Sequence, residues 1–291
     1  MGLIGVDAGG TSCRIALLWH GQRTELVLGR ANVASDFSGA VGLIGEGLEA
    51  VAVKAGLPKD QLWTCPAHLG LAGVVDETDA AAVVEALPLK FAEVGDDRRA
   101  TLVGALGDAD GTVAGVGTGS FLARRSGMDM QLVGGWGLRL GDEASGAWLG
   151  RRLLASVLEV VDGLREPTSL TEETFEAFRR SPGEIVKFSL DAAPADIAAL
   201  APKIVDAAKA NDPVGILLMN EGSGYLTATM VKLGWQERER ICLVGGVAPH
   251  YQAYLPERFA RSVVTAEGTA LDGALRLAGD LASRGKRQRA P

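Results

Sequence analysis

The sequence predicts an α/β protein of two domains, each built on a mixed β-sheet flanked by helices. Apolar, strand-like segments alternate with amphipathic, helix-like segments over most of the chain. A strand, a glycine-rich turn and a second strand occupy residues 3–19, and the same pattern returns at residues 112–124. These two patterns are about one domain length apart, and 291 residues suit two ordinary domains better than one.

The first half of the chain predicts an antiparallel meander extended by parallel strands. Its expected elements are, in order, a hairpin over 3–19, a strand at 24–28, a helix at 38–55, a strand at 62–72, a helix at 77–86, a strand at 89–94 and a helix at 98–106. Gly56 and Pro58 end the first of these helices. The order helix, strand, helix, strand requires crossover connections, which add parallel strands to the meander.

The second half predicts a similar sheet and a long helical region. Its expected elements are a hairpin over 112–124, a strand at 131–133, a helix from 144 to about 161, a mostly helical region over 162–235, a strand at 241–244 and a last helix at 268–282. Asp212 and Pro213 indicate a helix start, as N-cap and first helical residue. We therefore expect domains at 1–107 and 108–267, with a C-terminal helix over 268–285 that packs back on the first domain.

Charge and cysteine content exclude several classes of function. The formal net charge of −7 argues against nucleic acid as a partner, because phosphate backbones require a basic face. The three cysteines, Cys13, Cys65 and Cys242, include no CxxC pair, which fits a reducing cytoplasm and argues against a zinc site. No secretory signal and no apolar run of membrane-spanning length are visible. We expect a cytoplasmic protein with no membrane partner.

The turn of the first hairpin has the composition of a phosphate-binding loop. Asp7 is followed by Gly9, Gly10 and Thr11. Glycines let backbone N–H groups approach a ligand closely, and successive N–H groups in a turn attract anions. Asp7 would repel a phosphate unless a cation lay between them, and Mg²⁺ is the natural candidate. An ordinary hairpin with a Gly-Gly turn is the alternative.

Two further glycine-rich segments have similar compositions. Residues 115–120 (Gly-Val-Gly-Thr-Gly-Ser) fail as a dinucleotide fingerprint, because Ser120 replaces the third glycine and a strand follows where a helix is required. No Walker A sequence occurs in the chain. The turn still suits phosphate, with a purely structural turn as the alternative. Gly245 and Gly246 close an apolar strand, where small residues would let a flat ring or a ribose lie against the backbone.

Six short blocks occur in one order along nearly the whole chain. They are Asp-Ala-Gly-Gly-Thr at 7–11, Gly-Leu-Ala-Gly at 70–73, Gly-Thr-Gly-Ser at 117–120, Gly-Gly-Trp-Gly with Gly-Asp-Glu at 134–143, Leu-Val-Gly-Gly-Val at 243–247 and Gly-Thr-Ala-Leu-Asp-Gly-Ala at 268–274. Through these blocks the sequence resembles the N-acetylglucosamine kinase and BadF/BadG-type ATPase family, within the hexokinase–actin–chaperone superfamily. The glycine–tryptophan block indicates the amino-sugar kinase branch.

The resemblance implies two ribonuclease-H-like, actin-like ATPase domains with ATP and a sugar in the cleft between them. It also implies a kinase that uses ATP and Mg²⁺ to phosphorylate the 6-hydroxyl of N-acetylglucosamine or glucosamine, and a homodimer, as is usual among relatives. The implied site residues are Gly9, Gly10, Thr11, Gly117, Thr118 and Gly119 for phosphates, Gly245 and Gly246 for adenosine, Asn32, Gly135, Trp136, Gly137 and Asp142 for the sugar, and Asp7 for the metal.

The resemblance also indicates the catalytic base. Transfer to a sugar hydroxyl requires a carboxylate that accepts the hydroxyl proton. The family has an Asn-Asp-Ala triplet at the end of a strand, and this chain has Asp96-Asp97-Arg98 there. Asp97 matches the catalytic aspartate, while Asp96 and Arg98 depart from the pattern. Two adjacent carboxylates raise one pKa, an effect that Arg98 offsets. A pair of helix N-cap residues is the alternative.

Other functions within the same superfamily stay open. Asp142-Glu143 suits either a sugar contact or acidic residues that open a helix. An activator-type ATPase would hold an iron–sulfur cluster through cysteines, and none of the three cysteines lies on an expected interface loop. A non-catalytic sensor of sugar and ATP would have an added DNA-binding segment, which is not visible ahead of residue 3.

Overall fold

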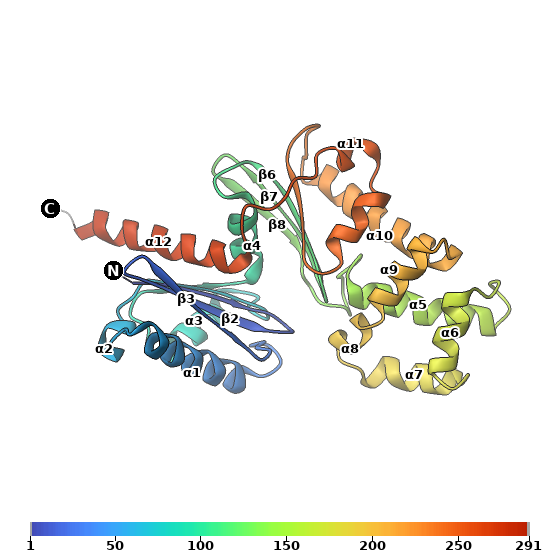
Figure 1. Ribbon diagram of the computed structural model, residues 1–291, viewed down its shortest axis with the longest axis horizontal. Helices are drawn as coiled ribbons and strands as arrows, with labels where there is room; N and C mark the ends of the chain where they lie inside the picture. The colour runs from blue at the N-terminus through green and yellow to red at the C-terminus, as the bar shows by residue number, and fades with distance from the viewer. Residues whose placement is uncertain (1, 290–291) are drawn as a thin grey trace. The chain divides into compact units, whose positions relative to one another are not determined.

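The computed structural model describes residues 2–289 and forms two compact units. The first unit combines the chain up to Ala109 with the segment from Ala266 onward, and the second unit comprises Asp110–Thr265. Each unit contains one mixed sheet with helices packed on it (Figure 1). No helix within residues 2–289 has the length and apolarity needed to cross a membrane.

The sheet of the first unit has the strand order β3-β2-β1-β4-β5. Its strands are β1 (Leu3–Ala8), β2 (Cys13–Trp19), β3 (Gln22–Leu28), β4 (Ala67–Leu71) and β5 (Ala92–Gly95). The first three form an antiparallel meander, and β4 and β5 are parallel to β1. This is the arrangement that the sequence predicts, because strands joined by short turns pair antiparallel and strands joined by helices pair parallel.

Helices cover both faces of this sheet (Figure 1). α1 (Phe37–Ala55) packs on β2 and β3, while α4 (Asp97–Leu106) and α12 (Ala270–Arg289) pack together on the face that includes β1 and β4. The side chains of Ile4 and Val6 enter the core beneath α1. Because side chains alternate along a strand, Gly5 and Asp7 face the side of α4 and α12. Gly5 fits there closely, since an added Cβ would lie 3.0 Å from Leu275 of α12.

Two expected strands begin later than the sequence predicts. The strand expected at 89–94 is β5, which begins only at Ala92. The apolar run over 62–72 is not a single strand, because its start belongs to the short helix α2 (Lys59–Leu62) and β4 begins only at Ala67. Turn hydrogen bonds from Thr64 and Cys65 to the preceding carbonyls separate the two elements. Pro66 has no N–H for a ladder, so it limits the strand at this end. The helix α3 (Glu77–Ala86) matches its predicted range.

The sheet of the second unit has the order β8-β7-β6-β9. Its strands are β6 (Gly111–Val116), β7 (Ser120–Ser126), β8 (Asp129–Gly134) and β9 (Ile241–Val244), and only β9 is parallel to its neighbour, β6. The helical elements are α5 (Gly146–Val161), α6 (Ser169–Ala177), α7 (Pro182–Asp191), α8 (Pro194–Ala198), α9 (Ala201–Lys209), α10 (Pro213–Lys232), the 3₁₀-helix η1 (Ala248–Tyr254) and α11 (Glu257–Ala260). The carboxylate of Asp212 caps α10 as predicted, accepting from the N–H groups of Val214 and Gly215.

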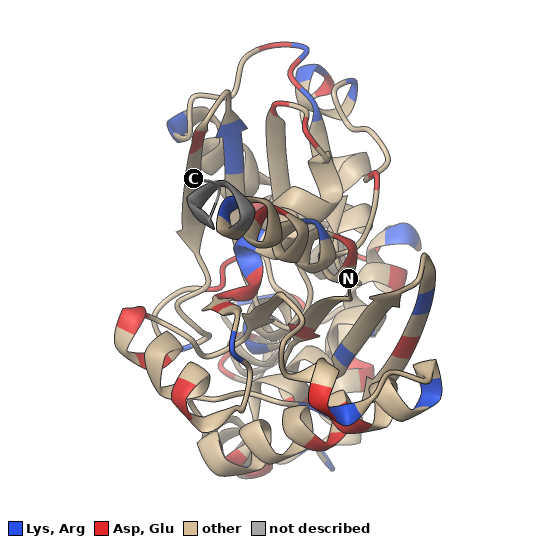
Figure 2. Ribbon diagram, turned by 90° about the vertical axis from the view of Figure 1, so that its left-hand side faces the viewer, with Lys and Arg blue, Asp and Glu red and all other residues tan. Residues whose placement is uncertain are grey.

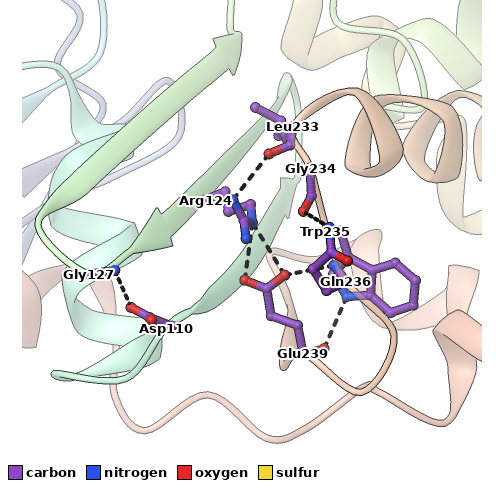
Figure 3. A network of polar contacts seen from close by, with 8 residues as sticks. All are labelled: Asp110, Arg124, Gly127, Leu233, Gly234, Trp235, Gln236 and Glu239. Carbon is purple, nitrogen blue, oxygen red and sulfur yellow. Dashed lines mark hydrogen bonds and ion pairs between the residues drawn. The ribbon is translucent and has the colours of Figure 1, made fainter.

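A polar network fixes the approach to β9 (Figure 3). The guanidinium of Arg124 on β7 donates to the carboxylate of Glu239 at 3.0 Å and to the carbonyl of Leu233 at 3.4 Å. The backbone carbonyl of Glu239 also accepts from the Trp235 indole at 3.0 Å. These hydrogen bonds fix the connection between α10 and β9 to β7. They therefore help to determine the position of β9 in the sheet.

Basic and acidic residues are interspersed along the ribbon (Figure 2). The densest run of basic residues in the sequence, Arg284, Lys286, Arg287 and Arg289, belongs to the end of α12.

Candidate active site

In the first unit, the turn between β1 and β2 presents backbone with little side-chain cover. Gly9 donates its N–H to the carbonyl of Ser12 at 2.9 Å, which closes the turn, and its own carbonyl accepts from Ala31 at 3.3 Å. Gly10 and Thr11 are exposed. A Cβ added at Gly10 would meet no heavy atom of the described chain within 4 Å, and Gly10 has no positive φ. Packing therefore gives no reason for glycine there, whereas close approach of a ligand would.

Asp7 and Asp97 lie on the same face of the first sheet. Asp7 pairs with Gly70 of β4 in the parallel register. A Cβ added at Gly70 would lie 3.3 Å from the Cα of Asp97 and 3.2 Å from the Cβ of Ala100. The start of α4 thus rests on Gly70, directly beside Asp7. Gly70 belongs to one of the sequence blocks. Its role is to let α4 approach β4 closely, and the sequence alone does not show that these two elements cross there.

Asp96 and Asp97 have different tasks at the start of α4. Asp96 is the N-cap, and its carboxylate accepts from the N–H of Arg98 at 2.9 Å. The guanidinium of Arg98 holds the same carboxylate with two hydrogen bonds of 2.9 and 3.0 Å. Asp97 is the first helical residue and is half-buried. The capping role is therefore filled by Asp96.

The pKa of Asp97 is raised to about 6, chiefly by burial and then by the negative charges of Asp7 and Asp96, against opposing effects of a backbone hydrogen bond and of Arg98. A carboxylate with a pKa near neutrality is suited to accept a proton, because it is mostly ionised at pH 7 and yet basic enough to take the proton. Burial also raises the pKa of Asp7, with Arg14 opposing the shift. Two half-buried carboxylates on one face disfavour each other's ionised form, so a cation at Asp7 would relieve both.

Asp7, the predicted metal residue, offers one carboxylate to Mg²⁺. Among residues 2–289 no group of three or more His, Cys, Asp or Glu side chains is arranged to hold a metal. Mg²⁺ in kinases is commonly held by one or two carboxylates with substrate phosphates and water completing the shell. Asp7, next to the open Gly9-Gly10 turn, satisfies this requirement.

Asn32 lies in the loop after β3, in the same unit. Its side-chain oxygen accepts from the N–H groups of Ala34 and Ser35 at 3.0 and 3.1 Å, which forms a tight turn. This loop packs on the turn after β4, where Gly73 has φ of 93° and an added Cβ would lie 2.6 Å from the Asn32 side-chain oxygen. The oxygen of Asn32 is thus engaged by the fold, so a ligand would meet its NH₂ group.

In the second unit, the turn over Gly117, Thr118 and Gly119 is held by the start of α5. The N–H groups of Gly146 and Ala147 donate to the carbonyls of Gly117 and Thr118 at 2.8 and 3.2 Å. A Cβ added at Gly117 would meet nothing within 4 Å in the described part of the chain. This turn therefore resembles the first one in having an open outer face.

Asp142 is brought against this turn. It is buried, and a Cβ added at Gly119 would lie 2.7 Å from its carboxylate, so only glycine allows the approach. The carboxylate of Asp142 accepts from the N–H groups of Gly137, at 3.3 Å, and of Ser120. Burial raises the pKa of Asp142, and those two hydrogen bonds oppose the shift.

The loop with Gly135, Trp136 and Gly137 connects β8 to Asp142. Gly135 and Gly137 have φ of 78° and 82°, values that favour glycine, and Gly135 donates to the carbonyl of Ser120 at 2.9 Å. Trp136 is 62 % exposed, so its indole is not a core side chain. The loop therefore has an exposed aromatic side chain six residues before the buried Asp142.

Gly245 and Gly246 differ although they are adjacent. Gly245 has φ of 99°, and an added Cβ would lie 2.4 Å from the carbonyl oxygen of Val116, so the fold itself requires this glycine. A Cβ at Gly246 would meet no described atom within 4 Å. Gly246 is exposed. Of these two residues, only Gly246 could be replaced by a larger residue without a clash within the described chain.

The cysteines have ordinary structural positions. Cys13, Cys65 and Cys242 are buried and form no disulfide among the described residues. Burial raises the pKa of Cys13 to about 12, and the charge of Asp7 adds to the shift. Buried thiols do not suit cluster ligands on an exposed interface loop, which an activator-type ATPase would require.

Comparison with known proteins identifies the family. The model of the BadF/BadG/BcrA/BcrD ATPase family matches residues 4–275. The chain belongs to this family. The glucosamine kinase of Vibrio cholerae is 29% identical over 282 residues, which cover 95% of either chain. Its name states a sugar kinase activity for that relative.

Solved structures of this family agree with the two-unit α/β architecture. A candidate N-acetylglucosamine kinase from Chromobacterium violaceum superposes with a TM-score of 0.84 at 29% identity, over 95% of this chain and 98% of that one. Another from Porphyromonas gingivalis gives a TM-score of 0.71 at 20% identity, over 96% and 99%. The predicted fold class, two domains of the actin-like ATPase kind with mixed sheets, is confirmed by these relatives.

Proposed function

We propose that this member of the family is an ATP-dependent amino-sugar kinase that phosphorylates the 6-hydroxyl of N-acetylglucosamine or glucosamine. The environment of Asp97 is the observation that supports the proposal most directly. The pKa of its carboxylate is raised to about 6, and Asp97 lies on the same face of the first sheet as Asp7. Asp97 does not cap α4, because Asp96 has that role. The Vibrio cholerae and Chromobacterium violaceum relatives are named for two closely related amino sugars.

In this mechanism Asp97 accepts the proton of the sugar hydroxyl. The hydroxyl oxygen forms a bond to the γ-phosphorus, the bond from that phosphorus to the bridging oxygen breaks, and ADP leaves with the electron pair. Mg²⁺, held on the Asp7 side, would neutralise charge that develops on the phosphates. Asp97 is ionised before the step and protonated after it, so its elevated pKa favours the transfer.

The other predicted residues divide between binding the nucleotide and binding the sugar. N–H groups of the open turns at Gly9, Gly10 and Thr11 and at Gly117, Thr118 and Gly119 suit phosphates. Gly245 and Gly246 would lie along the adenosine. The NH₂ group of Asn32, the carboxylate of Asp142 and the loop at 135–137 would bind the sugar. We further propose a homodimer in the reducing cytoplasm, which suits a chain with three buried cysteines and no CxxC pair.

The substrate is tested by ADP release with a panel of hexoses and amino sugars. We expect turnover with N-acetylglucosamine or glucosamine well above that with glucose. Sugar binding without ADP release would favour a sensor instead of an enzyme. Failure to bind or phosphorylate any member of the panel would contradict the kinase proposal.

Asp97→Asn tests the base, with Asp96→Asn as the matched control. General-base catalysis contributes about 10²–10⁴-fold, so we expect Asp97→Asn to lower kcat by about that factor. ATP binding, measured by calorimetry, should change little. Asparagine caps helices well, so Asp96→Asn should keep kcat within about tenfold of the parent. Equal losses in both variants would remove Asp97 from the proposed role.

A further inference from the structure

The turn at Asp142, Glu143 and Ala144 has an unfavourable backbone. Asp142 and Ala144 have φ of 60° and 68°, in the left-handed region that residues with a Cβ rarely adopt. Such conformations persist where surrounding contacts over-determine them, and they are frequent at ligand sites. The position of Asp142 therefore depends on the groups that hold this turn.

Three side chains hold the turn from three different elements. The hydroxyl of Ser120 on β7 donates to the carbonyl of Glu143 at 2.6 Å. The hydroxyl of Tyr251 on η1 donates to the carbonyl of Ala144 at 2.7 Å. On α10, the hydroxyl of Tyr225 interacts with the Glu143 side chain and with Thr229.

The hydroxyl of Tyr251 is enclosed by the core. Tyr251 is fully buried, and burial raises the pKa of its phenol well above the ordinary value. A Cβ added at Gly222 of α10 would lie 2.3 Å from the Tyr251 oxygen, so this glycine makes the space for it. The Tyr251 hydroxyl is therefore neutral and confined, and it donates to the Ala144 carbonyl from a fixed position.

Tyr251 belongs to the segment that begins at the proposed adenosine glycines. Val247, directly after Gly246, donates its N–H to the carbonyl of Val116 at 3.0 Å, and η1 starts at the next residue. The end of η1 is held on α10 by the Ser223 hydroxyl, which donates to the carbonyl of Tyr254 at 2.8 Å. A displacement of this short segment by a nucleotide would move the Tyr251 hydroxyl and, through it, the carbonyl of Ala144.

We propose that Tyr251 is a positioning residue that couples nucleotide binding at Gly245–Gly246 to sugar binding at Asp142. The inference rests on the proposed kinase function and deepens it. Tyr251 touches neither substrate in this proposal and acts through the backbone of Ala144. Coupling between two sites is reciprocal, so the nucleotide should tighten sugar binding by the same factor by which the sugar tightens nucleotide binding.

Calorimetry on the full chain tests the coupling. The Kd for N-acetylglucosamine is measured without nucleotide and with saturating non-hydrolysable ATP analogue and Mg²⁺, and the ratio of the two values is the coupling factor. Known couplings are typically about 5–150-fold. We expect a factor in this range for the parent and a reduction of at least about fivefold in Tyr251→Phe, which removes only the hydroxyl.

Tyr225→Phe is the matched control, because it also removes a hydroxyl that holds the turn but belongs to α10. It should weaken sugar binding and keep the coupling factor of the parent. Gly222→Ala, which displaces the Tyr251 hydroxyl without changing the tyrosine, should lower the coupling factor as Tyr251→Phe does. Thermal unfolding of each variant verifies that the fold is retained.

An unchanged coupling factor in Tyr251→Phe, or a parent with no coupling, would overturn the inference. An equal loss of coupling in Tyr225→Phe would also overturn it, because any loosening of the turn at 142–144 would then explain the loss without a specific role for Tyr251. ADP release by the parent is measured in parallel. Normal ADP release with unchanged coupling refutes only the role of Tyr251, whereas no ADP release with any amino sugar refutes the proposed function.

Discussion

At the scale of single residues, Asp96 and Asp97 illustrate how neighbours of the same type acquire different chemistry. Asp96 has its carboxylate fully engaged, by the N–H of Arg98 and by the Arg98 guanidinium. Asp97 lies against the sheet beside Asp7, and burial raises its pKa to about 6. The family pattern indicated Asp97, but the sequence alone could not exclude Asp96, because both are acidic residues at a helix start. The bidentate pair with Arg98 is what separates them.

The raised pKa of Asp97 implies a cost in stability. The folded protein binds a proton at Asp97 more tightly than the unfolded chain does, so ionisation of Asp97 destabilises the fold. This cost is fully present above the folded pKa of about 6 and disappears as the pH falls toward the unfolded value of 3.8. Asparagine has no charge to desolvate, so Asp97→Asn should be more stable than the parent at pH 7 although it is less active.

Urea unfolding in the presence of EDTA measures this effect. One unit of pKa shift corresponds to about 1.4 kcal/mol, and because Asp97 is only half-buried we expect Asp97→Asn to raise the free energy of unfolding at pH 7 by about 1–2 kcal/mol. The gain should shrink between pH 7 and pH 4.5. A gain that is independent of pH would contradict the assignment of the cost to the Asp97 charge, and Asp96→Asn should show no gain.

At the scale of elements, the glycine-rich turns were predictable as turns, but the reason for each glycine was not. The strand–turn–strand pattern is local, so both hairpins follow from the sequence. Gly119 and Gly245 are required because Asp142 and Val116 approach them, and these contacts join segments far apart in the chain. The proposed role of Tyr251 also depends on contacts between residues far apart in the chain, so the sequence could not predict it. The strand expected at 62–72 was wrong at its start, where turn bonds and Pro66 outweigh the apolar pattern.

Gly245→Ala and Gly246→Ala separate the two kinds of glycine with one type of substitution. Gly245→Ala places a Cβ 2.4 Å from the Val116 oxygen at a φ of 99°, so we expect a loss of stability above about 2 kcal/mol. Gly246→Ala has open space and should stay within about 0.5 kcal/mol of the parent. It should instead raise the KM for ATP about tenfold, a loss of about 1.4 kcal/mol in binding. An unchanged KM for ATP in a stable Gly246→Ala protein would remove Gly246 from the nucleotide site.

At the scale of the whole molecule, the first unit is discontinuous in sequence and the second is not. The chain leaves the first unit after Ala109 and returns to it at Ala266. The returning helix α12 packs on α4, β1 and β4 (Figure 1). The crossing of α12 with α4 is close because both helices have glycine there: a Cβ added at Gly104 would lie 1.9 Å from the Thr269 carbonyl oxygen, and one at Gly273 would lie 1.9 Å from that of Ala100. The first unit therefore depends on the last segment of the chain for its closure, and α4 also contains Asp97.

Gly273→Ala should loosen the first unit and leave the second intact, with Gly279→Ala on the same helix as the control. The Gly273 Cβ would overlap the backbone of α4, whereas a Cβ at Gly279 would only touch Leu3 at 3.7 Å. Alanine favours a helix over glycine by about 1 kcal/mol, so Gly279→Ala should be neutral or stabilising. Hydrogen exchange of the full chain distinguishes the outcomes. In Gly273→Ala, the amides of β1, β4 and α4 should exchange faster than in the parent, while those of β6 and β7 keep their protection. Faster exchange in both sheets would mean that the two units unfold together, and slow exchange in both would mean that α12 does not close the first unit.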